Sequence, residues 1–528
     1  MVKSVTLQRD KQEEKEMFVK VMLLIIFFGI MIGVGIVSRN QATSVNGFVL
    51  GGRNVGPWLT AFAYGTSYFS AVVFVGYAGQ FGWKYGLAST WIGIGNAVIG
   101  SLMAWVILGR RTRIMSHHLQ AATMPDFFGK RFHSNALRIA ASAIVFVFLI
   151  PYTASLYNGL SRLFGMAFDI PYEVCIVMMA VLTGVYVILG GYMATAINDF
   201  IQGIIMIGGI IAVIAAVLDG QGGFMNAVSR LSELESDIPV TMGQQGAFAS
   251  FFGPDPLNLL GVIILTSLGT WGLPQMVHKF YTIKNEKAVK TGTVISTVFA
   301  VIISGGCYFL GGFGRLFDSP AIYGENGSIA YDAIIPAMLS TLPDVLIGIV
   351  VILVLSASMS TLSSLVLTSS STLTLDFIKG NLIKNLSEKK QLLIMRILIV
   401  FFIGVSVVLA LDPPTFIAQL MGISWGALAG AFLAPFLYGL FWKGTTRLSV
   451  WASFFAGVGL TVANMFLKFI ESPINAGAAA MAAGLVIVPV VSLVTPKLEK
   501  KKLEEIFACY DEEVHVKRKV ALPEKETE

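Results

Sequence analysis

Long apolar runs, each about the length of a membrane-spanning helix, recur along the whole chain. A helix rises about 1.5 Å per residue, so about 20 apolar residues cross the roughly 30 Å of bilayer hydrocarbon. Only 13% of the residues are charged, against about 25% in soluble domains. We therefore predict an all-α polytopic membrane protein. We predict thirteen spans, at 19–38, 57–80, 86–109, 136–165, 172–190, 195–218, 256–278, 288–313, 333–375, 393–411, 414–441, 447–468 and 475–495.

The cysteines and the net charge exclude other classes of protein. Cys175, Cys307 and Cys509 are few and widely spaced, which excludes a disulfide scaffold and offers no metal-ligand spacing. The formal net charge of +6 comes from basic residues placed between apolar runs. Membrane topology explains that placement, so we expect no nucleic-acid partner. The lipid bilayer of the cell (plasma) membrane is the expected environment.

Basic residues cluster in three of the links between predicted spans. Because successive spans cross the membrane in opposite directions, these three links lie on the same side of the predicted bundle. Because lysine and arginine favour cytoplasmic loops, these links predict a cytoplasmic C-terminus and an N-terminus outside. Each link contributes several basic residues: Arg110, Arg111, Arg113, Lys130, Arg131 and Arg138; Lys279, Lys284, Lys287 and Lys290; and Lys379, Lys384, Lys389, Lys390 and Arg396.

This orientation divides the chain into segments. Residues 1–18 are expected outside, and 19–38 form an additional helix that is retained, since no clear signal-cleavage site follows it. Residues 219–255 form an extracytoplasmic loop. Two C-terminal helices occupy 447–495. Residues 496–528 form a charged cytoplasmic tail, partly disordered.

Two predicted spans contain a break. In 57–80, small and polar residues around Gly65 interrupt the apolar run, and in 256–278, Gly272 and Pro274 do so. Proline removes a backbone donor, and broken helices in lipid occur where they line protein or a watery cavity. These are the second and seventh spans, the relation expected of two five-helix units, 57–218 and 256–441, with inverted topology. Ordinary kinks are the alternative.

A ladder of hydroxyl side chains lies in the 333–375 span. Ser360, Thr361, Ser363 and Ser364 supply neutral, hard oxygen atoms. Such ligands suit a small monovalent cation that must be released again, whereas a cage of carboxylates would select a divalent ion. Small polar residues also allow helices to approach closely, and this second explanation stays open here.

Asp199 is an acid within the sixth span, about one turn from its start. Acids in membrane helices are costly and usually functional. A first-turn acid stabilised by the helix dipole is the alternative. The histidines form no cluster with a nucleophile or a metal ligand, and no phosphate-binding loop is present. We therefore expect neither an enzyme nor an ATP-driven pump.

A series of short motifs occurs along the chain: Leu50-Gly51-Gly52-Arg53 with Pro57, Ser67-Tyr68-Phe69-Ser70-Ala71, Gly190-Gly191 with Asp199 and Gln202, Gly272-Leu273-Pro274-Gln275, Met359-Ser360-Thr361-Leu362-Ser363-Ser364, Ser424-Trp425-Gly426 and Leu440-Phe441-Trp442-Lys443. Together these motifs resemble the sodium/solute symporter family, nearest its proline, pantothenate and monocarboxylate branches. The resemblance covers about residues 19–495. Tyr192 departs from the family pattern, which usually has Leu, Met or Phe there.

The resemblance implies an APC/LeuT-like fold with a five-plus-five inverted repeat, and it implies binding residues. No cofactor is implied beyond sodium as the coupling ion. The main sodium site would use main-chain carbonyls of Thr66, Phe69 and Ala357 with the hydroxyls of Ser360 and Thr361. A second sodium site, present in some members, would use Asp199, Ser360, Ser363 and Ser364.

The family's solute pocket, carried over by position, is partly apolar here. Two valines, Val72 and Val73, argue against a solute with many hydroxyls, which would lose water without gaining partners. A small solute bearing a carboxylate is expected: an amino acid such as proline, a monocarboxylate or pantothenate. The implied pocket residues are Tyr68, Val72, Val73, Trp271, Gln275, Gln419 and Trp425.

The resulting prediction is a secondary active transporter that moves sodium and the solute into the cell together by alternating access. Proton coupling through Asp199 is one alternative, and a sodium-coupled symporter of sugars or other solutes is another. The residues do not favour a membrane enzyme or a sensor. Sodium, the solute and the bilayer are the expected partners, and no obligatory protein partner is evident.

Overall fold

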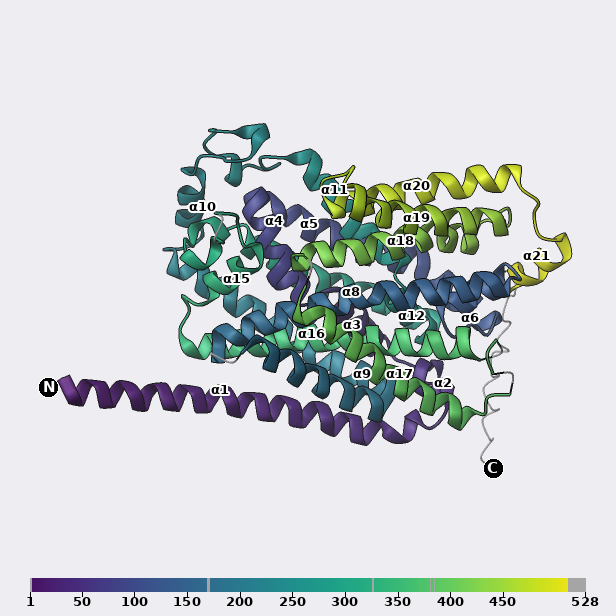
Figure 1. Ribbon diagram of the computed structural model, residues 1–528, viewed down its shortest axis with the longest axis horizontal. Helices are drawn as coiled ribbons and strands as arrows, with labels where there is room; N and C mark the ends of the chain where they lie inside the picture. Colours follow the sequence, from purple (N-terminus) through teal and green to yellow (C-terminus); the bar gives the residue numbers. More distant parts are fainter. Residues whose placement is uncertain are drawn as a thin grey trace, which may run out of the picture.

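The computed structural model describes residues 2–510 except 169–170, 325–326, 380, 384 and 414, and the described part is helical. It contains only isolated β-bridges and no strand. Most of the long helices lie side by side along one direction (Figure 1). The first half of the chain contains α1 (Val2–Ser38), α2 (Val45–Leu50), α3 (Pro57–Tyr68), α4 (Ala78–Tyr85), α5 (Thr90–Gly95), α6 (Arg110–His118), α7 (Met124–Arg131), α8 (Asn135–Phe168), α9 (Tyr172–Gly220) and α10 (Phe224–Ser232).

The second half is equally helical. It contains α11 (Pro256–Leu268), α12 (Pro274–Thr282), α13 (Glu286–Ala300), α14 (Gly306–Gly311), α15 (Tyr331–Leu339), α16 (Asp344–Thr372), α17 (Glu388–Leu411), α18 (Ile417–Phe441), α19 (Arg447–Leu467), α20 (Pro473–Val494) and α21 (Lys500–Phe507). Side-chain caps begin several of them: Asn285 Oδ1 accepts from Ala288 N at 2.8 Å before α13, and Thr446 Oγ1 accepts from Ser449 N at 3.3 Å before α19. Such caps satisfy the free N–H groups of the first turn.

Ten of the helices in the described part are long and apolar enough to cross a membrane, and one bent pair, Pro256–Gly272 with Pro274–Thr282, brings the number to as many as eleven. Two of the ten are far longer than a bilayer requires: Val72–His118, with 47 residues, and Tyr172–Gly220, with 49. Each contains a glycine with positive φ, Gly86 and Gly191.

The chain turns back at Gly191, whose φ of 54° and ψ of −147° only glycine adopts readily. Tyr186 and Asn198 flank it and would lie about 18 Å apart in a straight helix. A Cβ on Gly35 of α1 would nevertheless lie 3.4 Å from Tyr186 O, and Asn198 Nδ2 donates to Met31 O, four residues earlier on α1, at 3.3 Å. Both halves of α9 therefore lie against the same stretch of α1.

A similar turn occurs at Gly86, whose φ is 59° and ψ is −139°. Tyr64 Oη donates to Gly100 O at 2.7 Å, so the chain has returned to α3 by Gly100. These two turns divide the long helices Val72–His118 and Tyr172–Gly220. The divisions lie close to the predicted span ends at 80, 86, 190 and 195. The number of thirteen spans and their direction through the bilayer stay predictions.

Two predicted segments differ in extent. The helix expected at 19–38 begins already at Val2, so 1–18 is largely continuous with it. The long 333–375 stretch is interrupted after Leu339, and α16 begins at Asp344 after Pro343. Proline favours the first positions of a helix and is unfavourable in its interior. The tail contains α21 up to Phe507, and its expected disorder at 511–528 lies outside the described residues.

Candidate functional site

The first broken helix ends at Tyr68. Phe69 has φ −107° and ψ 104°, which is extended rather than helical, and a π-helical stretch, Val72–Tyr77, follows before α4. The carbonyl groups in the last turn of a helix lack N–H partners from a following turn. The carbonyl of Thr66 belongs to this turn and faces the neighbouring helix α16.

Two hydroxyls of α16 meet that carbonyl. Ser360 Oγ and Thr361 Oγ1 each donate to Thr66 O at 3.1 Å. The same hydroxyls also lie 3.1 and 3.2 Å from Ala357 O. All four residues are buried. Two carbonyl and two hydroxyl oxygens thus converge on one point, and a hydroxyl can turn a lone pair toward a cation in place of its proton.

Phe69 is near the same point without a hydrogen bond to the set. It lines a small cavity together with Ala357 and Ser70. The structure therefore gathers Thr66, Ala357, Ser360 and Thr361 by direct contacts and adds Phe69 by position. Neutral, hard oxygen atoms of this kind match the requirements of a monovalent cation.

The second break separates α11 from α12. A 3-10 turn, Gly269–Gly272, ends at Leu273, which has φ −86° and ψ 123°, and Pro274 begins α12 at an angle of 46°. A Cβ on Gly272 would lie 2.8 Å from Leu433 N of α18, so glycine permits this close approach. The first break likewise has Gly65 packed directly against the ring of Phe299.

A lysine occupies the region predicted for a second sodium ion. Lys279 Nζ lies 3.9 Å from Asp199 Oδ2 and donates to Ser364 Oγ at 2.9 Å. Ser364 Oγ in turn lies 2.8 Å from Ser67 Oγ on α3. Ser363 Oγ instead donates within its own helix, to Ser360 O at 2.9 Å. Ser364 is thus linked to Asp199 through Lys279.

The prediction that Lys279 lies in a link between two spans is wrong, because the residue belongs to the helix α12. The helix α12 continues to Thr282, and all nine of its residues are buried. Only 2% of the Lys279 side chain is exposed. The span was predicted to end at 278 because a lysine normally marks a membrane boundary. A lysine can instead lie inside a span when a buried acid on another helix pairs with it. Nothing in the sequence around Lys279 identifies which acid that would be.

Aromatic rings gather where the solute pocket was predicted. The rings of Tyr68 and Trp425 lie 6.1 Å apart, and Tyr152, on α8, lies 6.0 Å from Trp425 at nearly a right angle. Tyr68 Oη donates to Thr266 O at 2.5 Å. Val72 and Val73 begin the π-helical stretch beyond the break and are buried.

Other predicted pocket residues are spread more widely. Trp271 Nε1 donates to Ile99 O at 3.0 Å. Gln275 is buried, and its amide finds no hydrogen-bond partner among the described residues. Gln419 accepts from Thr415 and lines a polar cavity of about 620 Å³ that also contains Arg315. Gln419 therefore lines this polar cavity.

Tyr152 was missed in the sequence analysis. Its hydroxyl and Trp425 Nε1 are both buried and lie near each other and near Ser70, but neither makes a well-formed hydrogen bond in the described part of the chain. Buried polar groups usually have partners, so two unsatisfied donors beside each other suggest a site for a polar ligand. The only local sequence signal for Tyr152 is its position next to Pro151 within an apolar run. A tyrosine in that setting is common in membrane helices.

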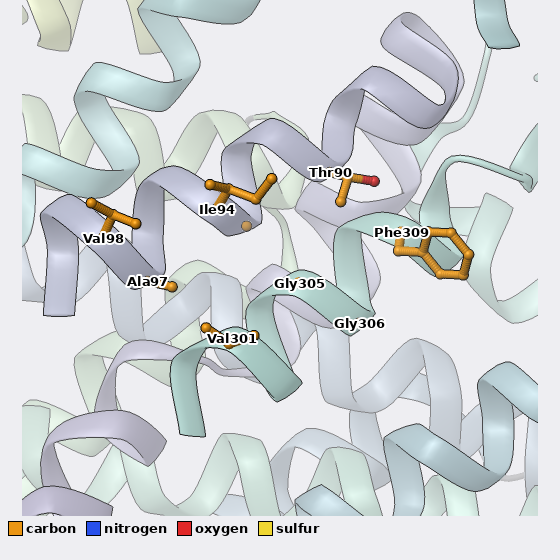
Figure 2. A pocket seen from close by; sticks show the side chains of 9 residues that line it. Thr90, Ile94, Ala97, Val98, Val301, Gly305, Gly306 and Phe309 are labelled. Atoms are coloured by element: carbon orange, nitrogen blue, oxygen red, sulfur yellow. The ribbon is translucent and has the colours of Figure 1, made fainter. Parts of the chain in front are cut away.

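A separate apolar groove carries no such chemistry. It runs between the segment 90–98 and the segment 301–309, and Thr90 supplies its only polar side chain (Figure 2). Ile94, Val98 and Val301 are each about half exposed. Apolar side chains of this exposure on a transmembrane protein face lipid.

The sequence matches a known family over most of its length. The profile of the sodium:solute symporter family matches residues 48–457. Among curated relatives, sodium/proline symporter 2 of Staphylococcus saprophyticus is 30% identical over 446 residues, covering 82% of this chain and 84% of the relative. A sodium/proline symporter of Staphylococcus aureus is 28% identical over 496 residues, covering 91% of this chain and 92% of the relative.

Solved structures show the same fold. A Na⁺-coupled sialic acid symporter, in a substrate-bound outward-open state, aligns with a TM-score of 0.75 at 16% identity, covering 91% of this chain and 98% of that one. Mhp1, a nucleobase-cation-symport-1 family transporter, aligns with a TM-score of 0.51 at 12% identity, covering 87% and 97%. The predicted LeuT-like, all-helical membrane fold is confirmed by these likenesses.

Proposed function

The chain belongs to the sodium:solute symporter family, and from this premise we propose that it couples the uptake of proline, or a closely similar carboxylate-bearing solute, to sodium. Its family and relatives are membrane transporters rather than enzymes. Sodium is the coupling ion that the family implies. The solute, the site residues and the division into two repeats, 57–218 and 256–441, are parts of the proposal.

One observation carries the proposal for the ion. The hydroxyls of Ser360 and Thr361 reach the carbonyl of Thr66 across the helix break, each at 3.1 Å. The carbonyls of Phe69 and Ala357 complete the proposed sodium site. Because its ligands come from α3 and α16, a bound ion would hold these two helices together and would favour one arrangement of the bundle.

The aromatic group supports the proposed solute. Proline has an apolar ring and a charged carboxylate, so it needs both an apolar wall and hydrogen-bond donors. Tyr68 and Trp425 supply flat apolar surfaces, while Trp425 Nε1 and the Tyr152 hydroxyl are donors that make no well-formed hydrogen bond within the described residues. The relatives named sodium/proline symporter support the same solute.

The second broken helix supplies a further attraction for a carboxylate. The N-terminus of α12, at Pro274, carries the positive end of the helix dipole, and the unpartnered amide of Gln275 lies in its first turn. Free half-helix ends of this kind commonly face anionic groups of solutes in broken-helix transporters. We place Val72, Val73 and Trp271 in the pocket wall and Gln419 at its outer mouth.

The proposed transport cycle is alternating access. Sodium and the solute bind from outside, each raising the affinity for the other. The outer path closes, the inner path opens, and both leave into the cytoplasm. Each net positive charge that moves inward releases about 2.3 kcal/mol per 100 mV of membrane potential. This energy and the sodium gradient drive the solute uphill.

Uptake of labelled proline into proteoliposomes tests the proposal. We expect an inward sodium gradient to drive accumulation and choline to fail, with competition by proline analogues and none by glucose. The double variant Ser360→Ala/Thr361→Val should abolish sodium-driven uptake. Its matched control is Ser358→Ala on the same helix, whose hydroxyl donates to Val354 O.

Two results would contradict the proposal. Accumulation driven by a proton gradient without sodium would favour proton coupling through Asp199. Normal sodium dependence in the double variant would remove the assigned ion site. A folded protein that takes up pantothenate, a monocarboxylate or a sugar but no proline would leave the family membership intact and change the solute.

A further inference from the structure

The proposed sodium-coupled transport raises the question of how many ions accompany each solute, and the inference below rests on that function. We propose that the Lys279 ammonium takes the place of a second sodium ion between Asp199 and Ser364. The protein then couples one sodium ion to each solute. This assignment replaces the second sodium site expected from Asp199, Ser360, Ser363 and Ser364.

The position of Lys279 is the first argument. Its ammonium lies 3.9 Å from Asp199 Oδ2 and donates to Ser364 Oγ at 2.9 Å, so it contacts two of the four groups expected to bind the ion. Both carboxylate oxygens of Asp199 are buried and accept no hydrogen bond from the described residues. The ammonium is the positive charge that compensates them.

The charge balance is the second argument. A buried carboxylate requires a paired charge, and sodium and ammonium each supply one positive charge. A sodium ion that entered the same region would meet the ammonium at a distance of a few ångströms. Repulsion between like charges is strong where the surroundings are poorly polarisable. The site can therefore hold only one cation, and the ammonium of the covalently attached lysine already occupies it.

The connections of Lys279 are the third argument. It belongs to α12, the helix that follows the second break, while Asp199 belongs to α9 and Ser364 to α16. Ser364 Oγ continues the chain of contacts to Ser67 Oγ of α3 at 2.8 Å. The face of the Tyr192 ring, 5.4 Å from Lys279 Nζ, adds a cation–π contact. The lysine thus joins both broken helices to the rest of the bundle, as a bound ion would.

Gradient balance in proteoliposomes measures the ratio of sodium to solute. At zero membrane potential, a tenfold sodium gradient is balanced by an opposing solute gradient of about tenfold for one ion and about a hundredfold for two. For the wild-type protein we expect the tenfold balance and a Hill coefficient for sodium of about 1. Binding of radioactive sodium to purified protein should show one ion per chain, independently of transport.

Removing the lysine should create the second site. In Lys279→Ala, the Asp199 carboxylate and the Ser364 hydroxyl remain without the ammonium, so we expect two sodium ions bound per chain. The Hill coefficient should exceed 1. The double variant Asp199→Asn/Lys279→Gln removes both charges and should bind one ion. Lys284→Ala is the matched control, because Lys284 is exposed five residues further on.

The outcomes separate this inference from the proposed function. Two sodium ions bound per wild-type chain would overturn the role of Lys279, even if Lys279→Ala failed to fold. One ion bound by both the wild type and a folded Lys279→Ala variant would also overturn it. A wild-type protein that bound no sodium would instead overturn the proposed sodium coupling.

Discussion

The hydroxyl of Thr361 donates a hydrogen bond to the main-chain carbonyl of Thr66 at 3.1 Å, although the two residues lie 295 positions apart in the chain. The carbonyl is available because α3 ends at Tyr68. The hydroxyl faces it because α16 passes beside the break. This contact joins the two halves of the chain at the proposed ion site.

Replacing Thr361 by valine keeps the shape of the side chain and removes the hydroxyl. The carbonyls of Thr66 and Ala357 lose one partner, and the ion loses one ligand. We expect the sodium concentration for half-maximal uptake to rise about tenfold or more, since an unsatisfied buried group costs about 1–3 kcal/mol. Thr361→Ser keeps the hydroxyl and should retain sodium dependence. An unchanged value in Thr361→Val would exclude Thr361 as a ligand.

Replacing Tyr152 by phenylalanine removes a hydroxyl that makes no well-formed hydrogen bond in the described part of the structure. If that hydroxyl binds the solute, the proline concentration for half-maximal uptake should rise about fivefold, which corresponds to about 1 kcal/mol for one hydrogen bond. Thermal stability should not fall. Tyr157→Phe, on the same helix, removes another unpartnered buried hydroxyl and should leave proline affinity unchanged. Equal effects from both variants would argue against the role of Tyr152.

Gly191→Ala should destabilise the protein. Its φ of 54° and ψ of −147° are unfavourable for any residue with a Cβ, and that Cβ would lie 2.8 Å from Phe48 O. We expect a loss of about 2–4 kcal/mol, combining strain and overlap. Gly208→Ala, in the same helix with open space around it, is the control. Thermal unfolding in detergent measures both, and equal melting temperatures would show that the turn tolerates a side chain.

Gly65→Ala tests the close packing beside the first break, because the new methyl would overlap the ring of Phe299. We expect a loss of about 1–3 kcal/mol from this overpacking and reduced sodium-driven uptake. A second change, Phe299→Leu, should restore part of both. Gly56→Ala, where a Cβ meets nothing within 4 Å, should behave like the wild type. No rescue by Phe299→Leu would mean that another contact requires Gly65.

Composition and hydropathy were enough to predict a helical membrane protein, because a segment in lipid must bond its own backbone and hide few charges. The order of motifs such as Gly272-Leu273-Pro274-Gln275 was enough to identify the family. The breaks near Gly65 and Pro274 were also visible, since small residues and proline interrupt an apolar run. Helix ends were less accurate, as the early start of α1 and the extension of α12 show.

The partner of a buried charge could not be deduced in this way. In the sequence, Asp199 was a single acid near the start of a span and Lys279 was one of several basic residues assigned to a link, so neither pointed to the other. Their 3.9 Å separation exists only because α9 and α12 both pack against α3 and α16. The same holds for Tyr152 beside Trp425. Local sequence determines whether a segment can enter a membrane, because that depends on the free energy of transferring its own side chains. Which side chains then meet depends on contacts between distant helices, and the tertiary structure alone decided those.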